Sequence, residues 1–296
     1  MGTMRPLIIL NPAAGSAAQA PKLREAVGDS ADIALCEGPG AARRLAADAV
    51  RKGRELVIAA GGDGTVHEVV QGLAVDFRRT RLGLIPFGTG NDLARTLGIP
   101  IDPIEALKML EGSAERVIDL VRAESGNDSA YCVNVAAGGF SGQVDEVLTD
   151  ELKATWGPLS YVRGALEVLP NLTEYKTTLA YDDGSWEAVP AFNVIVANGR
   201  TCAGGIRVAP DADPADGLID VVVVRYGSML DLAAVGASLL AGDYQTSSEV
   251  SHRRARRVRI ASKPGMWFNV DGELFTKEPV TFSIEPGVLR IAGVSP

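Results

Sequence analysis

The N-terminal part of the chain alternates short apolar runs with amphipathic stretches. The apolar runs predict strands over Arg5–Leu10, Asp32–Leu35, Glu55–Ala60 and Arg81–Ile85. Apolar residues at helical spacing predict helices over Lys22–Val27, Ala41–Arg51, the segment after Gly64, and Pro103–Glu111. Because strands and helices alternate, we expect a doubly wound α/β domain: a parallel sheet with helices on both faces.

The pattern changes after a last apolar run, Ala114–Val121. Glu124–Ser129 reads as a hairpin or a domain boundary, and two helical stretches follow, Tyr161–Leu169 and Met229–Leu240. The rest predicts short strands over Tyr131–Ala136, Tyr175–Tyr181, Phe192–Asn198, Leu218–Val224, Arg257–Ala261, Trp267–Val270 and Val280–Ile284. We therefore expect an α/β domain over residues 1–124, with 286–296 as a candidate return segment, and an antiparallel β-sandwich domain over 125–285.

Three loops follow predicted strands of the first domain and carry small or acidic residues. They are Asn11-Pro12-Ala13-Ala14-Gly15, Gly61-Gly62-Asp63-Gly64-Thr65-Val66-His67, and the stretch from Pro86 to Arg95 with Thr89 and Asp92. Glycines let the backbone approach a ligand, and a following helix offers free N–H groups to phosphate. Since parallel strands end at one edge, we expect the loops to meet there, although each alone is compatible with a plain turn. Asn91 or Asp92 is expected to cap the helix after the third loop.

Other carboxylates are candidates for chemistry. Asp63 suits magnesium, and Asp119 lies inside an apolar run, as either an edge-facing or a functional residue. Asp213 and Asp216 could share a hard cation with a carbonyl near Leu218, but the residues alone favour an Asp-Gly turn. Asp271-Gly272 predicts a hairpin turn, beside which Glu273 would be placed to act as a base.

Composition and charge exclude several classes. The chain of 296 residues has a net charge of −8, which argues against general nucleic-acid binding. The three cysteines, Cys36, Cys132 and Cys202, with only two histidines, form no Cys/His zinc pattern and suggest a reduced cytosolic setting. No stretch approaches the roughly 18 to 20 apolar residues of a membrane-spanning helix, so we expect a soluble or peripheral protein.

One segment departs from the acidic average. Residues 252–259, from His252 to Arg259, contain five arginines. They are interpreted either as a solvated edge strand that blocks aggregation or as a patch for an anionic membrane surface or a phosphate.

In order and spacing, five motifs resemble the bacterial diacylglycerol kinases and related lipid kinases. They are Asn11–Gly15, Gly61–Thr65, Pro86–Arg95, Asp213–Gly217 and Asp271–Glu273, and together they span nearly the whole chain. The resemblance implies an ATP-dependent lipid kinase, most simply one that converts diacylglycerol to phosphatidate. It also implies an active site in the cleft between an α/β nucleotide domain and a β-sandwich domain.

The resemblance also implies roles for particular residues. ATP would lie on Asn11–Gly15, on Gly61–His67 and on Thr89, while Asp63, Asp92 and Asp119 would surround the catalytic Mg²⁺ and the substrate hydroxyl. Glu273 matches the family's proton acceptor, and Asp213, Asp216 and the carbonyl of Leu218 match a second, structural Mg²⁺ site. Cys36 stands where the family usually has a nucleotide-contacting Thr, which puts that contact in doubt.

Alternatives remain open at this stage. A related kinase could act on a sphingoid base, ceramide or another lipid alcohol; NAD as acceptor is disfavoured by the motifs around Asp213 and Asp271. A catalytically silent nucleotide- or lipid-binding regulator is the alternative of another class. The expected partners are ATP, a membrane lipid and, transiently, an anionic membrane surface; no nucleic acid is expected, and a homodimer is compatible. The expected location is cytoplasmic, peripheral at the inner face of the membrane.

Overall fold

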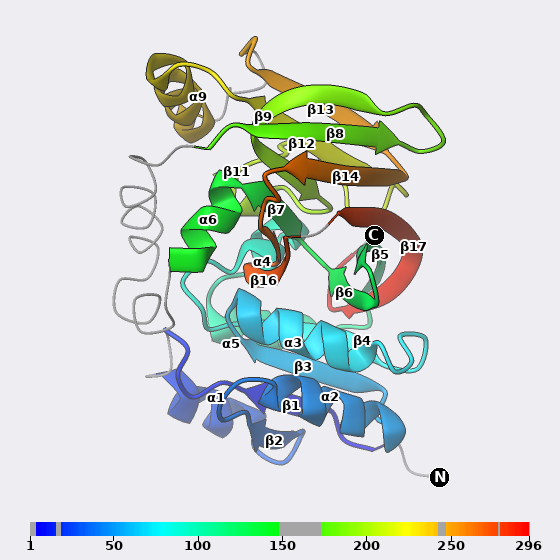
Figure 1. Cartoon of the computed structure of the whole chain (residues 1–296). Helices are drawn as coiled ribbons and strands as arrows, with labels where there is room; N and C mark the ends of the chain where they lie inside the picture. Colours follow the sequence, from blue (N-terminus) through cyan, green and yellow to red (C-terminus); the bar gives the residue numbers. More distant parts are fainter. Residues whose placement is uncertain (1–3, 16–18, 148–172, 242–246, 278, 296) are drawn as a thin grey trace. The chain divides into compact units, whose positions relative to one another are not determined.

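The computed structural model describes residues 4–15, 19–147, 173–241, 247–277 and 279–295. The chain divides into two compact units (Figure 1). The first comprises Met1–Asp119 and Pro286–Pro296, and the second Leu120–Glu285. The predicted helix Tyr161–Leu169 lies outside the described residues.

The first unit contains a parallel sheet built from the four apolar runs. Its strands are β1 (Leu7–Leu10), β2 (Asp32–Leu35), β3 (Leu56–Gly61) and β4 (Arg81–Pro86), in the order β4-β3-β1-β2. All three pairings are parallel. The end of β17 (Val280–Ala292) adds a further parallel neighbour to β4 through Ile291 and Leu82.

Helices cover both faces of this sheet, as expected. They are α1 (Ala20–Val27), α2 (Ala41–Arg51), α3 (Asp63–Leu73), α4 (Asp92–Leu97) and α5 (Pro103–Leu110). Ile8 and Leu10 pack in one buried cluster with residues of α1 and α5. Successive strand residues point to opposite faces, so Leu7 and Ile9 face the other side, where α2 contacts β1 and α3 contacts β3.

The second unit is a β-sandwich-like domain in which neighbouring strands pair antiparallel. Its main order is β16-β15-β7-β9-β8-β14-β17, and β12 joins β9 and β13. The strands are β5 (Glu115–Ser125), β6 (Asp128–Cys132), β7 (Val135–Gly139), β8 (Tyr175–Tyr181), β9 (Glu187–Ala197), β10 (Thr201–Cys202), β11 (Ile206–Arg207), β12 (Ile219–Arg225), β13 (Val250–Ala255), β14 (Arg257–Lys263), β15 (Phe268–Val270) and β16 (Glu273–Thr276). Its described helices are α6 (Phe140–Val147) and α9 (Met229–Ala241).

Both faces of the central strand β9 are buried. Val194 and Val196 lie in one apolar cluster with Phe268 and Phe282, while Ile195 and Ala197 lie in a second cluster. The two-residue period of a strand explains this division. A near-continuous apolar run is therefore required at β9, which is why the sequence identifies it readily.

Three of the predicted elements need correction. Strand β9 begins at Glu187, five residues before the predicted start at Phe192. The single strand expected over Tyr131–Ala136 is two strands, β6 and β7, because the N–H groups of Val133 and Asn134 turn to the carboxylate of Asp271. Strand β17 extends to Ala292, well beyond the predicted end at Ile284. Of the two interpretations of Glu124–Ser129, a hairpin or a domain boundary, the antiparallel pairing of β5 with β6 shows the hairpin. Among the described residues no helix is long and apolar enough to cross a membrane.

Candidate functional site

The loops after β1 and β3 contact each other at the carboxyl edge of the first sheet. Asn11 Nδ2 donates to Thr65 Oγ1 at 3.0 Å, and Asn11 Oδ1 accepts the N–H of Ala13 at 2.9 Å. Asn11 therefore shapes its own loop, through Pro12 to Ala14, and joins it to the first turn of α3. The two loops meet as the sequence predicted.

The loop after β4 approaches the same place through glycine. A Cβ on Gly88 would lie 2.4 Å from Cα of Gly62, so the two backbones pack with no room for a side chain. A Cβ on Gly15 would lie 3.3 Å from Thr89 Oγ1, which brings the first loop beside the third. The three loops thus form one cluster, which we call the glycine-loop cluster: residues 11–15, 61–67 and 86–92.

The expected cap of α4 is confirmed in position but not in its side-chain bonding. Asn91 occupies the cap position with φ +52°, but its side chain makes no capping bond to the helix. Its Oδ1 accepts from the N–H of Gly88 at 3.0 Å, and its Nδ2 donates to the Gly88 carbonyl at 2.7 Å. Asn91 therefore holds the loop that touches Gly62, a role that the spacing of residues in the sequence did not indicate.

Asp63 and Asp92 are neighbours within this cluster. The N–H of Asp92 donates to Asp63 Oδ1 at 2.7 Å, and Asp92 is buried. Burial and, secondly, the charge of Asp92 raise the pKa of Asp63 to about 6. Two nearby carboxylates suit a hard cation that completes its coordination with phosphate oxygens and water, so these donors fit Mg²⁺. A small pocket beside Asp63 is lined by Gly61, Gly62, Asn91 and Leu93.

Four further candidates of the first unit are buried. Asp119 is buried, and its Oδ1 accepts the N–H of Gly287 at 2.7 Å, which ties β5 to the returning strand β17. Cys36 is buried after β2; burial and, secondly, the charge of Glu68 raise the pKa of its thiol. Val66 and His67 are buried on α3, next to Thr65.

Glu273 begins β16, directly after the predicted turn. Asp271 and Gly272 have φ of +50° and +86°, and Val270 pairs with Glu273, so the hairpin is confirmed. The Glu273 side chain is exposed. The turn is anchored by Asp271, whose carboxylate accepts the N–H groups of Val133, Asn134 and Val135. Cys132 donates its thiol to the same carboxylate.

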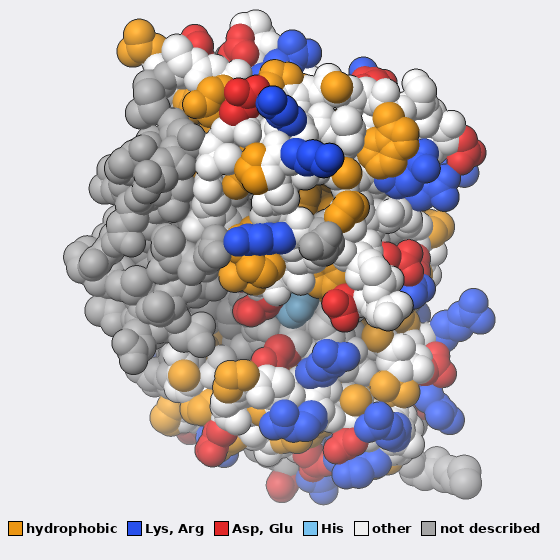
Figure 2. All heavy atoms as spheres, in the orientation of Figure 1, with side chains coloured by type: hydrophobic (Ala, Val, Ile, Leu, Met, Phe, Trp, Pro, Cys, Tyr) orange, Lys and Arg blue, Asp and Glu red, His pale blue; other side chains and the backbone are white. Residues whose placement is uncertain are grey.

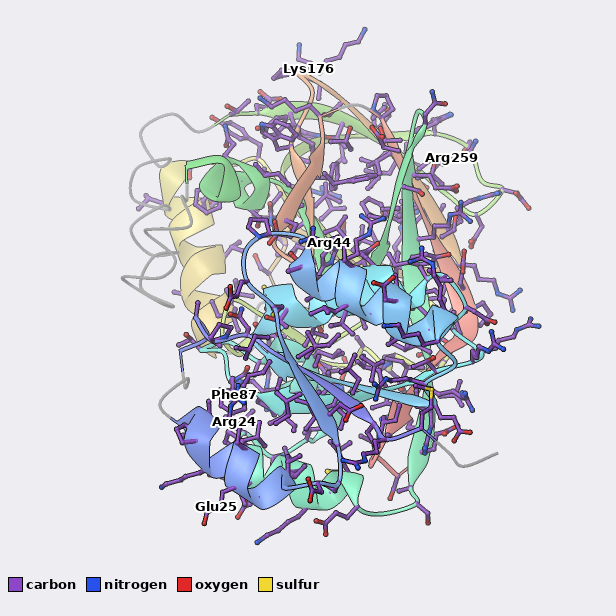
Figure 3. The ribbon with its side chains drawn as sticks, turned by 90° about the horizontal axis from the view of Figure 1, so that it is seen from below. Arg24, Glu25, Arg44, Phe87, Lys176 and Arg259 are labelled. Carbon is purple, nitrogen blue, oxygen red and sulfur yellow. The ribbon has the colours of Figure 1, made fainter. Side chains whose placement is uncertain are left out.

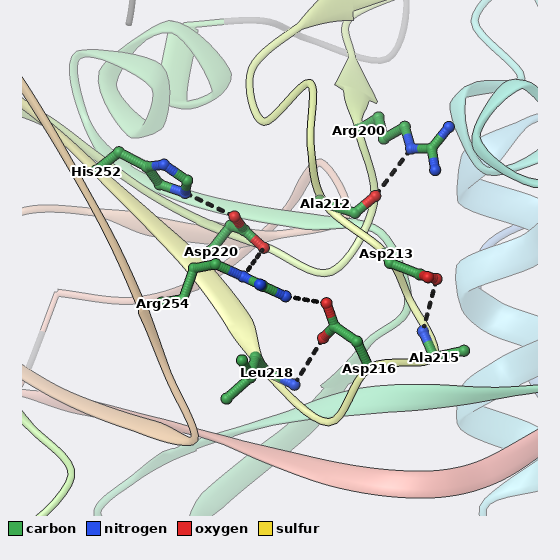
Figure 4. A network of polar contacts seen from close by, with 9 residues as sticks. All are labelled: Arg200, Ala212, Asp213, Ala215, Asp216, Leu218, Asp220, His252 and Arg254. Carbon is green, nitrogen blue, oxygen red and sulfur yellow. Dashed lines mark hydrogen bonds and ion pairs between the residues drawn. The ribbon is translucent and has the colours of Figure 1, made fainter.

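The loop with Asp213 and Asp216 is internally bonded (Figure 4). Asp213 Oδ1 accepts the N–H of Ala215 at 3.1 Å, and Asp216 Oδ1 accepts the N–H of Leu218 at 3.0 Å. The other Asp216 oxygen contacts the guanidinium of Arg254, which also lies 3.8 Å from buried Asp220. The carboxylate of Asp216 is thus shared between the N–H of Leu218 and the guanidinium of Arg254. The second Mg²⁺ site on Asp213, Asp216 and the carbonyl of Leu218 stays a prediction.

The arginines of residues 252–259 are spread over β13 and β14. Arg253 pairs with Glu187 at 2.7 Å and Arg257 with Asp183 at 2.6 Å. Within the described residues β13 pairs with β12 alone, which supports the edge-strand interpretation. On the face drawn in Figure 2, basic and acidic side chains are interspersed, and no broad positive area stands out.

A different family model matches each of the two units. Residues 5–123 match the diacylglycerol kinase catalytic domain, and residues 130–293 match the YegS C-terminal NAD kinase beta sandwich-like domain. The chain is 34% identical over 298 residues to a protein of Xanthomonas oryzae pv. oryzae named "Probable lipid kinase YegS-like", covering 96% of this chain and 94% of that one. It is 32% identical over 236 residues to the diacylglycerol kinase of Bacillus subtilis, covering 79% and 76%.

The fold is shared with a solved structure. A crystal structure described as "a putative diacylglycerol kinase" from Bacillus anthracis superposes with a TM-score of 0.81 at 25% identity, covering all of this chain and 97% of that one. These similarities define an enzyme of the lipid kinase class, a phosphotransferase with an alcohol acceptor. The chain belongs to the YegS and diacylglycerol kinase family of lipid kinases.

Sequence reasoning missed several residues that hold the site together. The sequence predicts a cap at Asn91 or Asp92, a turn at Asp271 and no role for Glu68. In the structure Asn91 binds the backbone of Gly88 in its own loop, whereas Asp271 and Glu68 bind backbone groups of other segments. The sequence does show Asn91 in a glycine-rich loop and Glu68 on the helix that begins at Asp63. It does not show that their partners are Gly88 and Gly40.

Proposed function

We propose that this lipid kinase transfers the γ-phosphate of Mg-ATP to the hydroxyl of diacylglycerol and forms phosphatidate. The observation that carries the proposal is the glycine-loop cluster, in which Asn11 contacts Thr65, Asp92 contacts Asp63, and Gly88 packs on Gly62. Backbone N–H groups beside glycines and a helix N-terminus suit a triphosphate.

The residues divide the work of phosphoryl transfer. Asn11–Gly15, Gly61–Thr65 and Thr89 bind and orient the phosphates, and Asp63 with Asp92 supplies oxygen donors to Mg²⁺. When bound, the ion neutralises charge that develops on the phosphates. Asp119 joins β5 to β17 by accepting the N–H of Gly287. Most of the rate enhancement comes from positioning and charge stabilisation.

Glu273 is proposed as the group that accepts the proton of the lipid hydroxyl. We predict that Glu273→Gln lowers kcat by about 10² to 10⁴-fold, the usual contribution of a positioned base. The exposed side chain and the Asp271 anchor of its turn leave the fold unchanged. The measurement is the initial rate of phosphatidate formation, with Glu25→Gln, an exposed acid on α1, as the matched control. Full activity in folded Glu273→Gln would remove the residue from the mechanism.

Transfer of labelled γ-phosphate from Mg-ATP to lipids in mixed micelles tests the function itself. The acceptors are diacylglycerol, a sphingoid base, ceramide and NAD, and Asp63→Asn provides the blank. Labelled phosphatidate is the expected product. Label in another lipid would replace diacylglycerol as the substrate, and bound ATP without any product would favour a silent regulator.

A further inference from the structure

Glu68, on α3, caps a different helix. Its Oε1 accepts the N–H of Gly40 at 2.6 Å, and its Oε2 accepts those of Ala42 at 3.0 Å and Arg43 at 3.4 Å. These N–H groups lie at the start of α2, which has no acidic residue in its first turn and no side-chain cap of its own. The carboxylate of α3 therefore fills the acceptor positions that a local cap usually supplies.

The position of this contact connects it to the glycine-loop cluster. Glu68 lies one turn after Asp63-Gly64-Thr65 on the same helix. Gly40, the first residue that it holds, lies four residues after Cys36 in the sequence. The N–H of Cys36 donates to the carbonyl of Leu10 at 3.0 Å, next to Asn11. Glu68 thus joins the segment after β2, which belongs to none of the three loops, to the helix that carries Asp63.

Local geometry adapts the segment to this contact. Gly40 has φ +73°, a left-handed conformation that glycine adopts without strain. Gly72, one turn further along α3, brings the helices together, because a Cβ there would lie 2.4 Å from the Arg43 carbonyl. Helices α2 and α3 are therefore in close contact beside the position where Glu68 caps α2.

Because Glu68 caps the N-terminus of α2, that end of the helix is less available to bind an anion. The start of α2 is a position where N–H groups and the helix dipole favour negative charge. Glu68 already supplies that charge, so a phosphate has no free donors at Gly40, Ala42 and Arg43. The proposed phosphate-binding groups are then those of Asn11–Gly15, of Gly61–Thr65 at the start of α3, and Thr89, and the start of α2 is not among them.

We propose that Glu68 is a positioning residue for the nucleotide, which shapes residues 36–43 into one wall of the ATP site and keeps phosphates off α2. The inference rests on the proposed function, since it assigns a task to the same nucleotide site. Glu68 itself contacts no reacting atom; it acts through the backbone that it holds.

The test uses the whole protein with Glu68→Gln and Glu68→Ala, and with Glu25→Gln as the matched control for loss of one carboxylate. Glu25 is an exposed residue of α1, labelled in Figure 3. Hydrogen exchange reports on the amides of Gly40, Ala42 and Arg43, and calorimetry gives the Kd of Mg-ATP. Kinetics then separate KM for ATP from kcat and from KM for the lipid.

We expect faster exchange at residues 40–43 and a rise of about tenfold in Kd and KM for ATP in Glu68→Ala, with kcat and lipid KM within about twofold. Glu68→Gln retains one acceptor oxygen and should fall between Glu68→Ala and the wild type. Unchanged ATP affinity in both variants, with wild type binding ATP, would overturn the inference and leave the function intact. If the wild-type protein itself does not bind ATP, both the proposed function and the role of Glu68 are overturned. Slow amide exchange at residues 40–43 of that protein would show that the Glu68 contact is intact, so that the failure lies in the function.

Discussion

At the scale of single residues, the candidate site depends on polar groups that serve two segments at once. Asn11 bonds within its own loop and to Thr65, and Asp63 accepts the N–H of Asp92. Such contacts satisfy buried polar groups and also fix the distance between loops. Removal of one partner therefore affects both the local stability and the shape of the site.

The raised pKa of Asp63 predicts a pH-dependent cost. Its pKa is about 6 in the folded protein, above the ordinary Asp value. Well below pH 4 the carboxyl is protonated in both states and costs no stability. Between about pH 4 and 6 the unfolded state loses its proton while folded Asp63 keeps it, so folding stability falls over this range and stays at the lower value above pH 6. We expect Asp63→Asn, in metal-free buffer, to be more stable than wild type by about 3 kcal/mol at pH 7.5 and close to it in stability near pH 3.5.

Urea unfolding of both proteins at the two pH values measures this difference. Asp102→Asn is not a suitable control because Asp102 caps α5, whereas exposed Asp29 bears no such role. Asp29→Asn should therefore show no comparable change. An Asp63→Asn protein that is less stable at pH 7.5 would contradict the cause given for the pKa shift.

At the scale of elements, glycine sets how closely helices and loops approach. Gly72 on α3 faces Arg43 and Ala46 on α2, and Gly88 faces Gly62 between two loops. Close contact between α2 and α3 is what allows Glu68 to reach the start of α2. Packing thus couples α3, which carries Asp63, to α2, whose start is held by Glu68.

Gly72→Ala should destabilise the protein by about 1 to 3 kcal/mol, the range for overpacking. The added Cβ would lie 2.4 Å from the Arg43 carbonyl oxygen and 2.6 Å from Ala46 Cβ. Gly236→Ala on α9 is the control, because a Cβ there meets nothing within 4 Å and the change favours helix. Chemical unfolding measures the free energy of unfolding of both variants and of the wild type. A Gly72→Ala protein as stable as the wild type would show that α2 moves away from α3 at no cost.

At the scale of the whole molecule, charge is distributed in pairs. The arginines of β13 and β14 face Glu187, Asp183 and Asp216, and the chain carries a net charge of −8. Exposed pairs contribute little to stability, but they cancel the field that an anionic surface would sense. Three of the five arginines, Arg253, Arg254 and Arg257, are therefore neutralised by carboxylates, and contact of the run with a membrane stays a prediction.

We predict that Arg253→Gln with Arg257→Gln leaves flotation with anionic vesicles within about twofold of wild type. Two unpaired arginines near a bilayer would contribute about 2 kcal/mol, or about thirtyfold in binding. Vesicles of neutral lipid provide the baseline. A tenfold loss, confined to anionic vesicles and sensitive to salt, would instead assign membrane contact to these arginines.

The sequence by itself determined the succession of elements and the position of the three loops. Strand and helix periods are local properties, so β1 to β4 and the helices between them appear in the residue pattern. The glycine and Asp-Gly motifs are local too, and the family resemblance that they carried is confirmed by the matches to both units.

Only the tertiary structure decided which groups meet. Glu68 and Gly40 are 28 residues apart, Asp271 and Val133 are 138 apart, and Arg254 and Asp216 are 38 apart. The break between β6 and β7 and the Arg254 contact at the Asp213 loop follow from such pairings. No period in the sequence encodes them, because each depends on how two separately formed elements cross or align and on which polar groups are left to satisfy there.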